Sequence, residues 1–210
     1  MITATRYDIR TMTEADIVQV AQIERESFPS TWPATAYRRE LANNLARYLV
    51  LVDRSHPPVS ANAEPRRRSL FDMFKRGIST SETTEFIVGY VGVWLLVDQA
   101  HIVAIAVREE YRRRGLGELL LVEAIDLALE SGQESVTLEV RRSNVSAQTL
   151  YEKYRFLKVG TRKRYYSDNH EDAIIMTTPP ISSDAYLEHL AYLRGRLERR
   201  LAADETPTSG

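Results

Sequence analysis

Residues Ile102 to Gly117 read I-V-A-I-A-V-R-E-E-Y-R-R-R-G-L-G and decide the fold. The stretch opens as an apolar, β-branched run, which is typical of a buried strand. It continues through three arginines and two glycines into an apolar-periodic helix that begins near Leu116. The N–H groups at a helix start have no intrahelical acceptor and the dipole there is positive. The stretch therefore predicts a strand, an anion-binding turn and a helix.

Two common phosphate-binding loops do not match this turn. The Walker loop requires Gly-Lys-Ser/Thr, and the Rossmann fingerprint requires a third glycine where this chain has Leu120. Arg112-x-x-Gly115-x-Gly117 instead resembles the acetyl-CoA pyrophosphate loop of the GNAT superfamily of N-acetyltransferases, Gln/Arg-x-x-Gly-x-Gly/Ala. A solvated basic turn that caps a helix would look the same over so few residues, so the remaining motifs have to distinguish the two.

Composition narrows the possible functions. The chain has 210 residues, 43% of them hydrophobic, which suits one domain with appendages. A formal charge of −1 predicts no global attraction to nucleic acid or acidic membranes, so such binding would have to come from a local patch. We expect neither a membrane nor directly bound nucleic acid as a partner. The absence of cysteine excludes disulfides, thiolate metal sites and a cysteine acyl-enzyme, and the scattered histidines predict no metal site. We expect no signal peptide or membrane span, and a cytoplasmic location.

Periodicity and turn residues predict an α/β layered domain over residues 1–178. Helices are expected over 14–27, 33–43, 116–131 and 145–154, and strands over 7–10, 48–53, 86–97, 101–107, 135–141, 158–166 and 171–178.

Two appendages interrupt or follow this pattern. Residues 54–84 are polar and turn-rich and are expected to form a flexible insertion. Its basic island, 66–76, could bind an acidic partner or RNA, although a solvated loop is the preferred interpretation. Residues 179–210 predict an amphipathic helix and a disordered tail from Ala203. The helix could pack on the body or dock a partner.

Four further motifs carry a family resemblance. They are Leu138-Glu-Val-Arg-Arg-Ser-Asn144, Ala147-Gln-Thr-Leu-Tyr151, Arg162-Lys-Arg-Tyr-Tyr166 and Glu171-Asp-Ala-Ile-Ile-Met176. With them, the chain from about Tyr7 to Met176 resembles the bacterial ribosomal-protein-alanine N-acetyltransferases of the RimI type. The resemblance implies the GNAT fold, a mixed central sheet of six to seven strands flanked by about four helices, with the C-terminal helix as an addition. It also implies acetyl-CoA as acetyl donor and the N-terminal alanine of a small-subunit ribosomal protein as acceptor.

The catalytic residues follow from the same resemblance. An α-amine has an ordinary pKa of about 8 and must lose a proton before it can attack a thioester. A carboxylate at the end of a strand can take that proton directly or through water. Glu139 matches the family's base and Tyr151 its general acid. Alternatively, Glu139 is an exposed carboxylate paired with Arg141, and Tyr151 is a core residue.

The resemblance also implies the residues that contact the donor. A splayed strand would supply backbone N–H groups to the thioester carbonyl, and Asn144 would both contact CoA and cap a helix. The expected cofactor-binding residues are Ile105, Ala106, Val107, Arg112, Arg113, Arg114, Gly115, Leu116, Gly117, Glu118, Asn144 and Tyr151. Without cysteine or a Ser/His pair in these motifs, direct transfer in a ternary complex is expected.

Some features leave alternatives open. The family usually has glycine where this chain has Arg155, which would carry a strain of roughly 1 kcal/mol if that site requires positive φ. Phe28 to Trp32, with Tyr165 and Tyr166, are expected to wall the acceptor groove, although they could equally be core. A lysine or broad-specificity protein acetyltransferase is the nearest alternative function, and a non-catalytic acyl-CoA-binding sensor is another.

Overall fold

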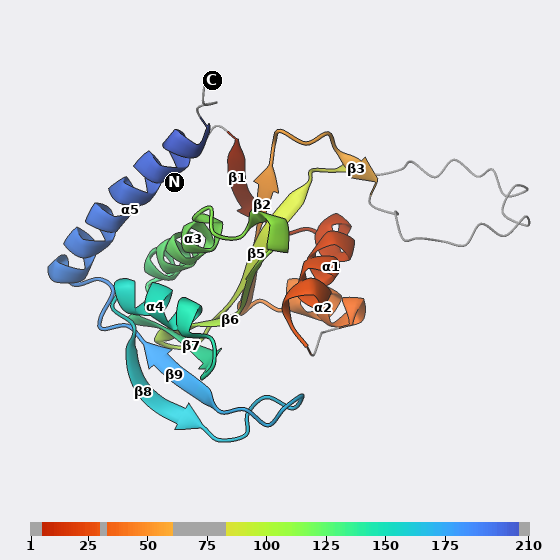
Figure 1. The fold of residues 1–210 in the computed structure, drawn as a ribbon. Helices are drawn as coiled ribbons and strands as arrows, with labels where there is room; N and C mark the ends of the chain where they lie inside the picture. The colour runs from red at the N-terminus through yellow and green to blue at the C-terminus, as the bar shows by residue number, and fades with distance from the viewer. Residues whose placement is uncertain (1–5, 30–32, 61–82, 206–210) are drawn as a thin grey trace, which may run out of the picture.

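A seven-stranded mixed sheet forms the centre of the molecule (Figure 1). The structure, a computed structural model, describes residues 6–29, 33–60 and 83–205, so the basic island at 66–76 lies outside the described residues. The strand order is β1-β2-β5-β6-β7-β9-β8. The strands are β1 Tyr7–Thr11, β2 Ala46–Asp53, β5 Ile87–Leu95, β6 Gln99–Val107, β7 Ser135–Arg141, β8 Leu157–Arg162 and β9 Ala173–Thr177. β3 Val59–Ser60 and β4 Thr83–Thr84 pair separately as a short ribbon.

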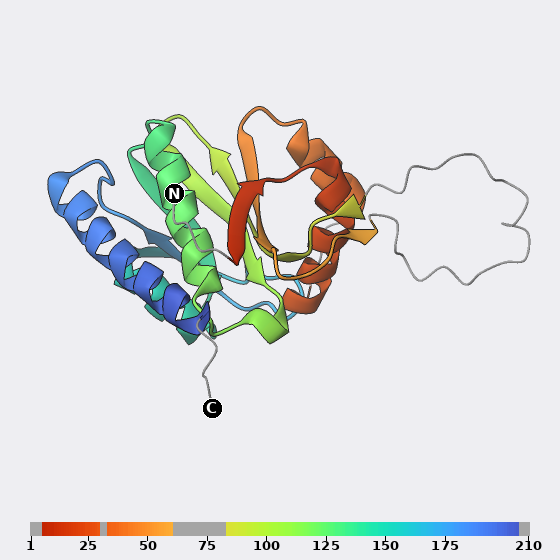
Figure 2. The same ribbon diagram turned by 90° about the horizontal axis from the view of Figure 1, so that it is seen from above.

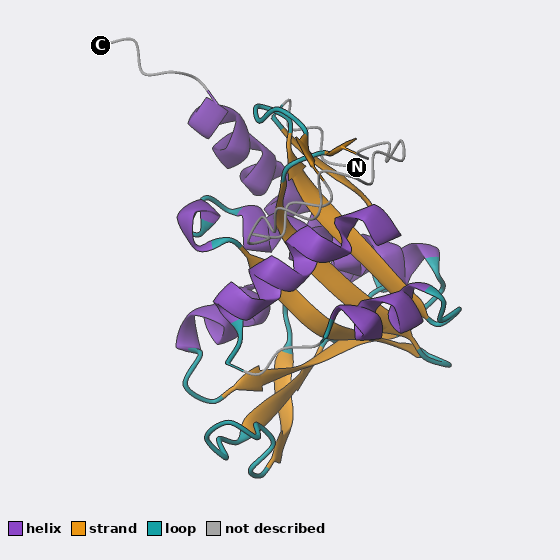
Figure 3. Ribbon diagram, turned by 90° about the vertical axis from the view of Figure 1, so that its right-hand side faces the viewer, coloured by secondary structure: helices purple, strands orange, loops and turns teal. Residues whose placement is uncertain are grey.

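Helices cover both faces of this sheet (Figures 2 and 3). The helices are α1 Ile17–Ser27, α2 Ala34–Leu41, α3 Leu116–Glu130, α4 Val145–Lys153 and α5 Asp184–Glu205. α1 and α2 pack on one face around Val20, Ile23 and Tyr37. α3, α4 and α5 cover the other face, where α3 is apolar nearly all round and buries Leu120 and Leu121 completely. The predicted mixed sheet flanked by helices is confirmed.

The central strands β6 and β7 separate along their length. They pair in parallel only from Gln99 with Ser135 to Ile102 with Leu138. Beyond that point β6 continues to pair with β5 as far as Val107, whereas β7 continues to pair with β9. The backbone of β6 after Ile102 therefore faces a gap in the ladder, where its polar groups are open to a ligand.

The loop between β8 and β9 corrects two predicted boundaries. Strands were expected over 158–166 and 171–178, but β8 ends at Arg162 and β9 begins at Ala173. Arg164 and His170 adopt φ values of 53° and 57°, in the left-handed region that interrupts an extended chain. Consequently Tyr165 and Tyr166 lie in a loop and not in a strand.

The C-terminal helix α5 packs against the body of the protein (Figure 1). Its buried face consists of Tyr186, Leu190, Leu193, Leu197 and Leu201. Arg194 pairs with Asp126 and Arg200 with Glu118, so α5 runs antiparallel to α3. The helix continues to Glu205, so the disordered tail expected from Ala203 is wrong for 203–205, and the rest of that expected tail lies outside the described residues. None of the helices in the described part of the chain is both long and apolar enough to cross a membrane.

Candidate active site

The predicted anion-binding turn lies at the start of α3. Gly115 precedes the helix with φ 86°, a left-handed conformation that glycine adopts without strain. A Cβ atom at this position would collide with the guanidinium of Arg200, which lies directly against the loop. The first N–H groups of α3 have no intrahelical acceptor. The left-handed conformation therefore favours glycine at position 115, whereas the Arg200 guanidinium, as the end of a flexible side chain, could shift to admit a Cβ atom.

The arginines of this turn have separate roles. Arg112 donates from Nε to the Val107 carbonyl at 3.1 Å and from Nη2 to Ser27 Oγ at 3.2 Å, which ties the turn to α1. Arg114 donates to the Glu110 carbonyl at 2.8 Å. Arg113 adopts φ 66°, so this segment changes direction just before the helix. The cations and open N–H groups suit a phosphate-bearing ligand such as CoA.

Glu118 connects the helices behind the turn. Its buried carboxylate accepts hydrogen bonds from Lys153, from Tyr154 Oη at 2.7 Å and from Arg200 Nη2 at 2.8 Å. Burial alone would raise the pKa of Glu118, but the hydrogen bonds from Lys153 and Tyr154 and the nearby positive charges hold it below its ordinary value. The side chain of this predicted cofactor residue therefore joins α3, α4 and α5, while its backbone N–H remains at the helix start.

Glu139 is held by two basic side chains. His101 Nε2 lies 2.6 Å from Oε2, and Arg162 Nε lies 2.9 Å from Oε1. The hydrogen bond from His101 is the main reason that the pKa of Glu139 lies below its ordinary value, against the opposing effect of burial. The alternative pairing with Arg141 is wrong, because Arg141 pairs with Asp168 at 2.8 Å and Glu171 at 3.3 Å.

Tyr151 lies on α4, and Asn144 is the residue that caps the start of this helix. The Tyr151 ring is buried beside Phe156, with ring centroids 5.7 Å apart, and burial raises the pKa of its hydroxyl. Asn144 caps the helix by accepting from the Ala147 N–H at 3.1 Å. Within the described ranges, no group of three or more His, Cys, Asp or Glu side chains could hold a metal ion.

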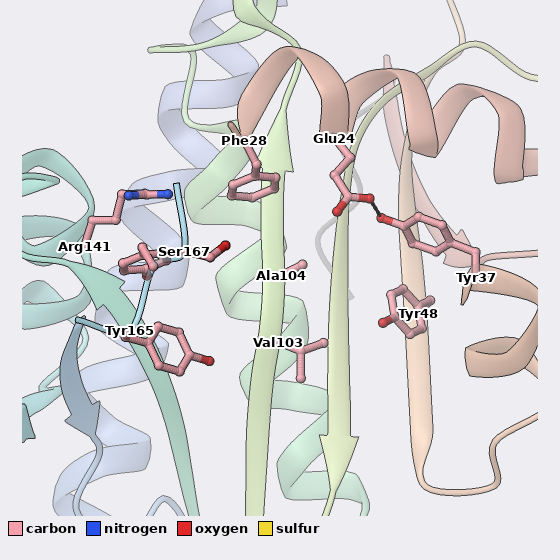
Figure 4. A pocket seen from close by; sticks show the side chains of 10 residues that line it. Glu24, Phe28, Tyr37, Tyr48, Val103, Ala104, Arg141, Tyr165 and Ser167 are labelled. Carbon is pink, nitrogen blue, oxygen red and sulfur yellow. Dashed lines mark hydrogen bonds between the residues drawn. The ribbon is translucent and has the colours of Figure 1, made fainter. Parts of the chain in front are cut away.

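A pocket of about 310 Å³ opens beside β6 on the α1 and α2 face (Figure 4). It is lined by Glu24, Phe28, Tyr37, Tyr48, Val103, Ala104, Arg141, Tyr165, Tyr166 and Ser167. Tyr37 donates its hydroxyl to Glu24 and lies 3.1 Å from the hydroxyl of Tyr90. Arg141 stacks over the Tyr166 ring, 3.8 Å from its centroid. The pocket thus combines aromatic walls, a carboxylate and a strand edge next to the proposed donor site.

The sequence identified part of this pocket. Phe28, Tyr165 and Tyr166 were expected to wall a groove and they line the pocket, whereas 30–32 lies outside the described residues. Glu24 was not singled out as a site residue. The available signal was its helical spacing from Ile17, Val20 and Ala21, because a carboxylate on a core-facing stripe is unusual.

Comparisons with known proteins show which family the chain belongs to. A family model described as the acetyltransferase (GNAT) family matches residues 17–156. A Bacillus subtilis protein assigned as a ribosomal protein bS18-alanine N-acetyltransferase is 36% identical over 173 residues, covering 82% of this chain and 95% of the relative. An N-alpha-acetyltransferase of Saccharolobus solfataricus is 34% identical over 175 residues, covering 82% of this chain and 93% of the relative.

One solved structure illustrates the similarity of fold. The ribosomal-protein-S18-alanine N-acetyltransferase of Escherichia coli matches with a TM-score of 0.64 and 24% identity, covering 85% of this chain and 97% of that chain. The family match ends before α5, so this helix lies outside the segment that the family model describes.

Proposed function

This chain belongs to the GNAT family of acetyltransferases, and from that premise we propose that it transfers the acetyl group of acetyl-CoA to the N-terminal α-amine of a protein. The proposed acceptor is the N-terminal alanine of a small-subunit ribosomal protein, as the name of the Bacillus relative suggests. This acceptor would place the enzyme in the cytoplasm. The observation that carries the proposal is the aromatic pocket with a carboxylate in its wall, adjacent to the open edge of β6.

The proposed site for acetyl-CoA extends from β6, past the start of α3, to α4. Acetyl-CoA supplies an acetyl thioester when it is bound. We assign the open N–H groups at the start of α3 and the cations around Gly115 to the phosphates. In the same proposal, backbone N–H groups of Ile105 to Val107 stabilise negative charge that develops on the carbonyl oxygen, because they lie on β6 beyond its last pair with β7.

Proton transfer would be divided between two residues, Glu139 on β7 and Tyr151 on α4. Glu139 takes a proton from the acceptor ammonium, and because it does not line the pocket, the transfer runs through a water molecule. The neutral amine nitrogen then forms a bond to the acetyl carbon as the carbon–sulfur bond breaks, and the nitrogen releases its second proton to water, from which Tyr151 is reprotonated after it has given its own proton to the sulfur. Tyr151 donates its proton to the sulfur; burial raises the pKa of its hydroxyl, which is therefore protonated at neutral pH.

A peptide competition assay tests this function. Purified protein and acetyl-CoA are mixed with one peptide that has a free N-terminal alanine and blocked lysines, and with another that has a blocked N-terminus and free lysines. Fragmentation mass spectrometry locates the acetyl group. We expect it on the alanine amine, with the signal lost in Glu139→Gln.

The other outcomes separate the alternatives. Label on lysine would assign the protein to the lysine acetyltransferases. Label on neither peptide, with acetyl-CoA still bound, would contradict the proposed acceptor.

A further inference from the structure

Glu24 is the feature of the pocket that the proposed chemistry does not yet use. It lies on the core-facing side of α1 and is only 6% exposed. Burying an ionised carboxylate is costly unless it is held by hydrogen bonds or an opposite charge. The Tyr37 hydroxyl donates to Glu24, and Tyr37 is in turn within hydrogen-bond distance of Tyr90, which is fully buried. A rigid tyrosine pair therefore orients this carboxylate.

The chemistry of the pocket indicates what Glu24 can bind. Arg141 is the other charged side chain in the lining, and it is directed into ion pairs with Asp168 and Glu171. Glu24 is the carboxylate among the residues that line the pocket. An ionised carboxylate accepts several hydrogen bonds, so its bond from Tyr37 is compatible with binding a cation. The aromatic walls suit an organic cation, which is attracted to the face of an aromatic ring.

The position of Glu24 also suits the acceptor. Figure 4 shows its side chain extending into the pocket from α1, with Ala104 of β6 in the opposite wall. Ala104 immediately precedes Ile105, where the proposed carbonyl-binding segment begins. An ammonium group held at Glu24 would therefore be close to the strand at which the acetyl group is presented. At neutral pH the α-amine is largely protonated, so its charged form is the one first bound.

We propose that Glu24, oriented by Tyr37, binds the α-ammonium group of the acceptor peptide and so selects acceptors that carry a free amine. This inference rests on the proposed function and assigns an acceptor-binding residue to it. Glu24 holds the ammonium group, whereas removal of the proton remains the role of Glu139.

The test compares the binding of two peptides without turnover. One peptide begins with alanine, and the other has a propionyl group in its place, which removes only the amine. Affinities are measured by isothermal titration calorimetry with saturating CoA, which has no acetyl group to transfer. Because a charge-assisted hydrogen bond in a buried site is strong, we expect the wild-type protein to bind the alanine peptide about tenfold or more tightly than the propionyl peptide.

The variants then assign the preference to a residue. Glu24→Gln is expected to bind both peptides with similar affinity, and Tyr37→Phe to reduce the preference. Glu26→Gln is the matched control, because Glu26 lies on the same helix and pairs with Arg108 at 3.7 Å outside the pocket. It should retain the wild-type preference. The affinity for CoA should be unchanged in all three variants.

Two results would overturn the inference. One is a Glu24→Gln protein that still prefers the alanine peptide to the propionyl peptide. The other is a wild-type protein that binds both peptides equally, and this second result does not depend on whether any variant folds. If wild type still acetylates the alanine peptide in the competition assay, the proposed function stands and only the role of Glu24 is lost. If neither peptide binds and neither is acetylated, the proposed function and the role of Glu24 are both contradicted.

Discussion

Glu139 illustrates how neighbouring residues set the pKa, and so the charge, of one carboxylate. His101 and Arg162 approach different oxygens of this carboxylate, from β6 and from the end of β8. Because both partners favour the ionised form, the carboxylate is charged throughout the neutral range. Its charge state is therefore not the factor that limits the rate near neutral pH.

The pH dependence of the reaction tests this conclusion. A lowered pKa keeps Glu139 ionised above its ordinary value of about 4.3, so the acceptor amine alone should titrate near pH 8. We expect kcat/KM for an alanine peptide to rise with pH to a plateau near the amine pKa, without an inflection near the ordinary carboxyl pKa. Steady-state kinetics from weakly acidic to basic pH would measure it.

Substitution of Glu139, the proposed base, measures how much this residue contributes to the rate of acetyl transfer. Glu139→Gln should lower kcat by roughly 10²- to 10⁴-fold, the usual range for general base catalysis. Glu152→Gln, an exposed residue of α4 that pairs with Lys158 at 3.0 Å, is the control and should retain activity. A wild-type inflection near pH 4 to 5 would contradict the lowered pKa of Glu139.

Arg155 is strained, but it also makes a contact. It occupies the position where the family usually has glycine, and its φ of 60° meets the condition under which strain was expected. Its Nη1 atom donates to the Ala185 carbonyl at 3.0 Å, which links α4 to α5. The hydrogen bond offsets part of the conformational cost.

Two substitutions of Arg155 separate the effect of backbone strain on stability from the effect of the hydrogen bond to Ala185. Arg155→Ala keeps the left-handed strain and loses the hydrogen bond, so it should be roughly 1 kcal/mol less stable than Arg155→Gly, which loses only the bond. Arg155→Gly should remain within about 1 kcal/mol of wild type. Urea unfolding at equilibrium would measure both. An alanine variant more stable than the glycine variant would contradict this account.

Among the elements, α5 could be predicted as an amphipathic helix, but the surface on which it packs could not be predicted. The spacing of its leucines in the sequence predicted an amphipathic helix, and the same residues are buried. Its packing surface on α3 was not visible in the sequence, because Glu118 and Asp126 look like ordinary surface carboxylates on a helix. Only the fold brings Arg200 and Arg194 opposite them.

A pair of identical substitutions tests whether α5 contributes to stability. Leu197 is 2% exposed and Leu187 is 39% exposed on the same helix. Leu197→Ala should lower the free energy of unfolding by about 2–5 kcal/mol, because it removes buried apolar atoms and leaves a cavity. Leu187→Ala should change it by less than about 1 kcal/mol. Equal small effects would indicate that α5 does not unfold with the domain.

Other elements were harder to predict for the same reason. The strands β6 and β7 were recognised from their apolar, β-branched runs, but their separation depends on how β7 pairs with β9. Tyr165 and Tyr166 extended a strand-like pattern, and the left-handed residues that interrupt it carry no glycine signal. Local patterns fixed the identity of the elements, whereas non-local pairing determined the site.

At the scale of the whole molecule, buried ion pairs connect stability to pH. The carboxylates of Asp16 and Asp53 are fully buried and pair with Arg10 at 2.7 Å and Arg6 at 2.8 Å. Burial alone would raise their pKa values, but the hydrogen bonds from these arginines lower them. Asp126 has the opposite shift, mainly because of burial.

Acid should therefore destabilise the protein. A group with a lowered folded pKa contributes stability above its unfolded pKa, about 3.9 for Asp, and loses it as the pH falls through the folded value. We expect the urea midpoint to be nearly constant from weakly acidic to neutral pH and to fall below about pH 4. Asp8→Asn, which changes an exposed pair with Arg54, should leave this profile unchanged. A midpoint that stays constant to pH 3 would contradict the prediction.

The pocket draws its walls from distant parts of the chain, whereas the proposed donor residues of β6 and the glycine turn form one short segment, 105–118. Apart from Val103 and Ala104 on β6, the residues that line the pocket therefore lie far from the donor segment in the sequence. Mutations around Glu24 or in the loop that carries Tyr165 can alter the choice of acceptor while the donor segment is inherited intact. Related proteins can therefore evolve new acceptor specificities while they retain the residues that bind the nucleotide of the donor.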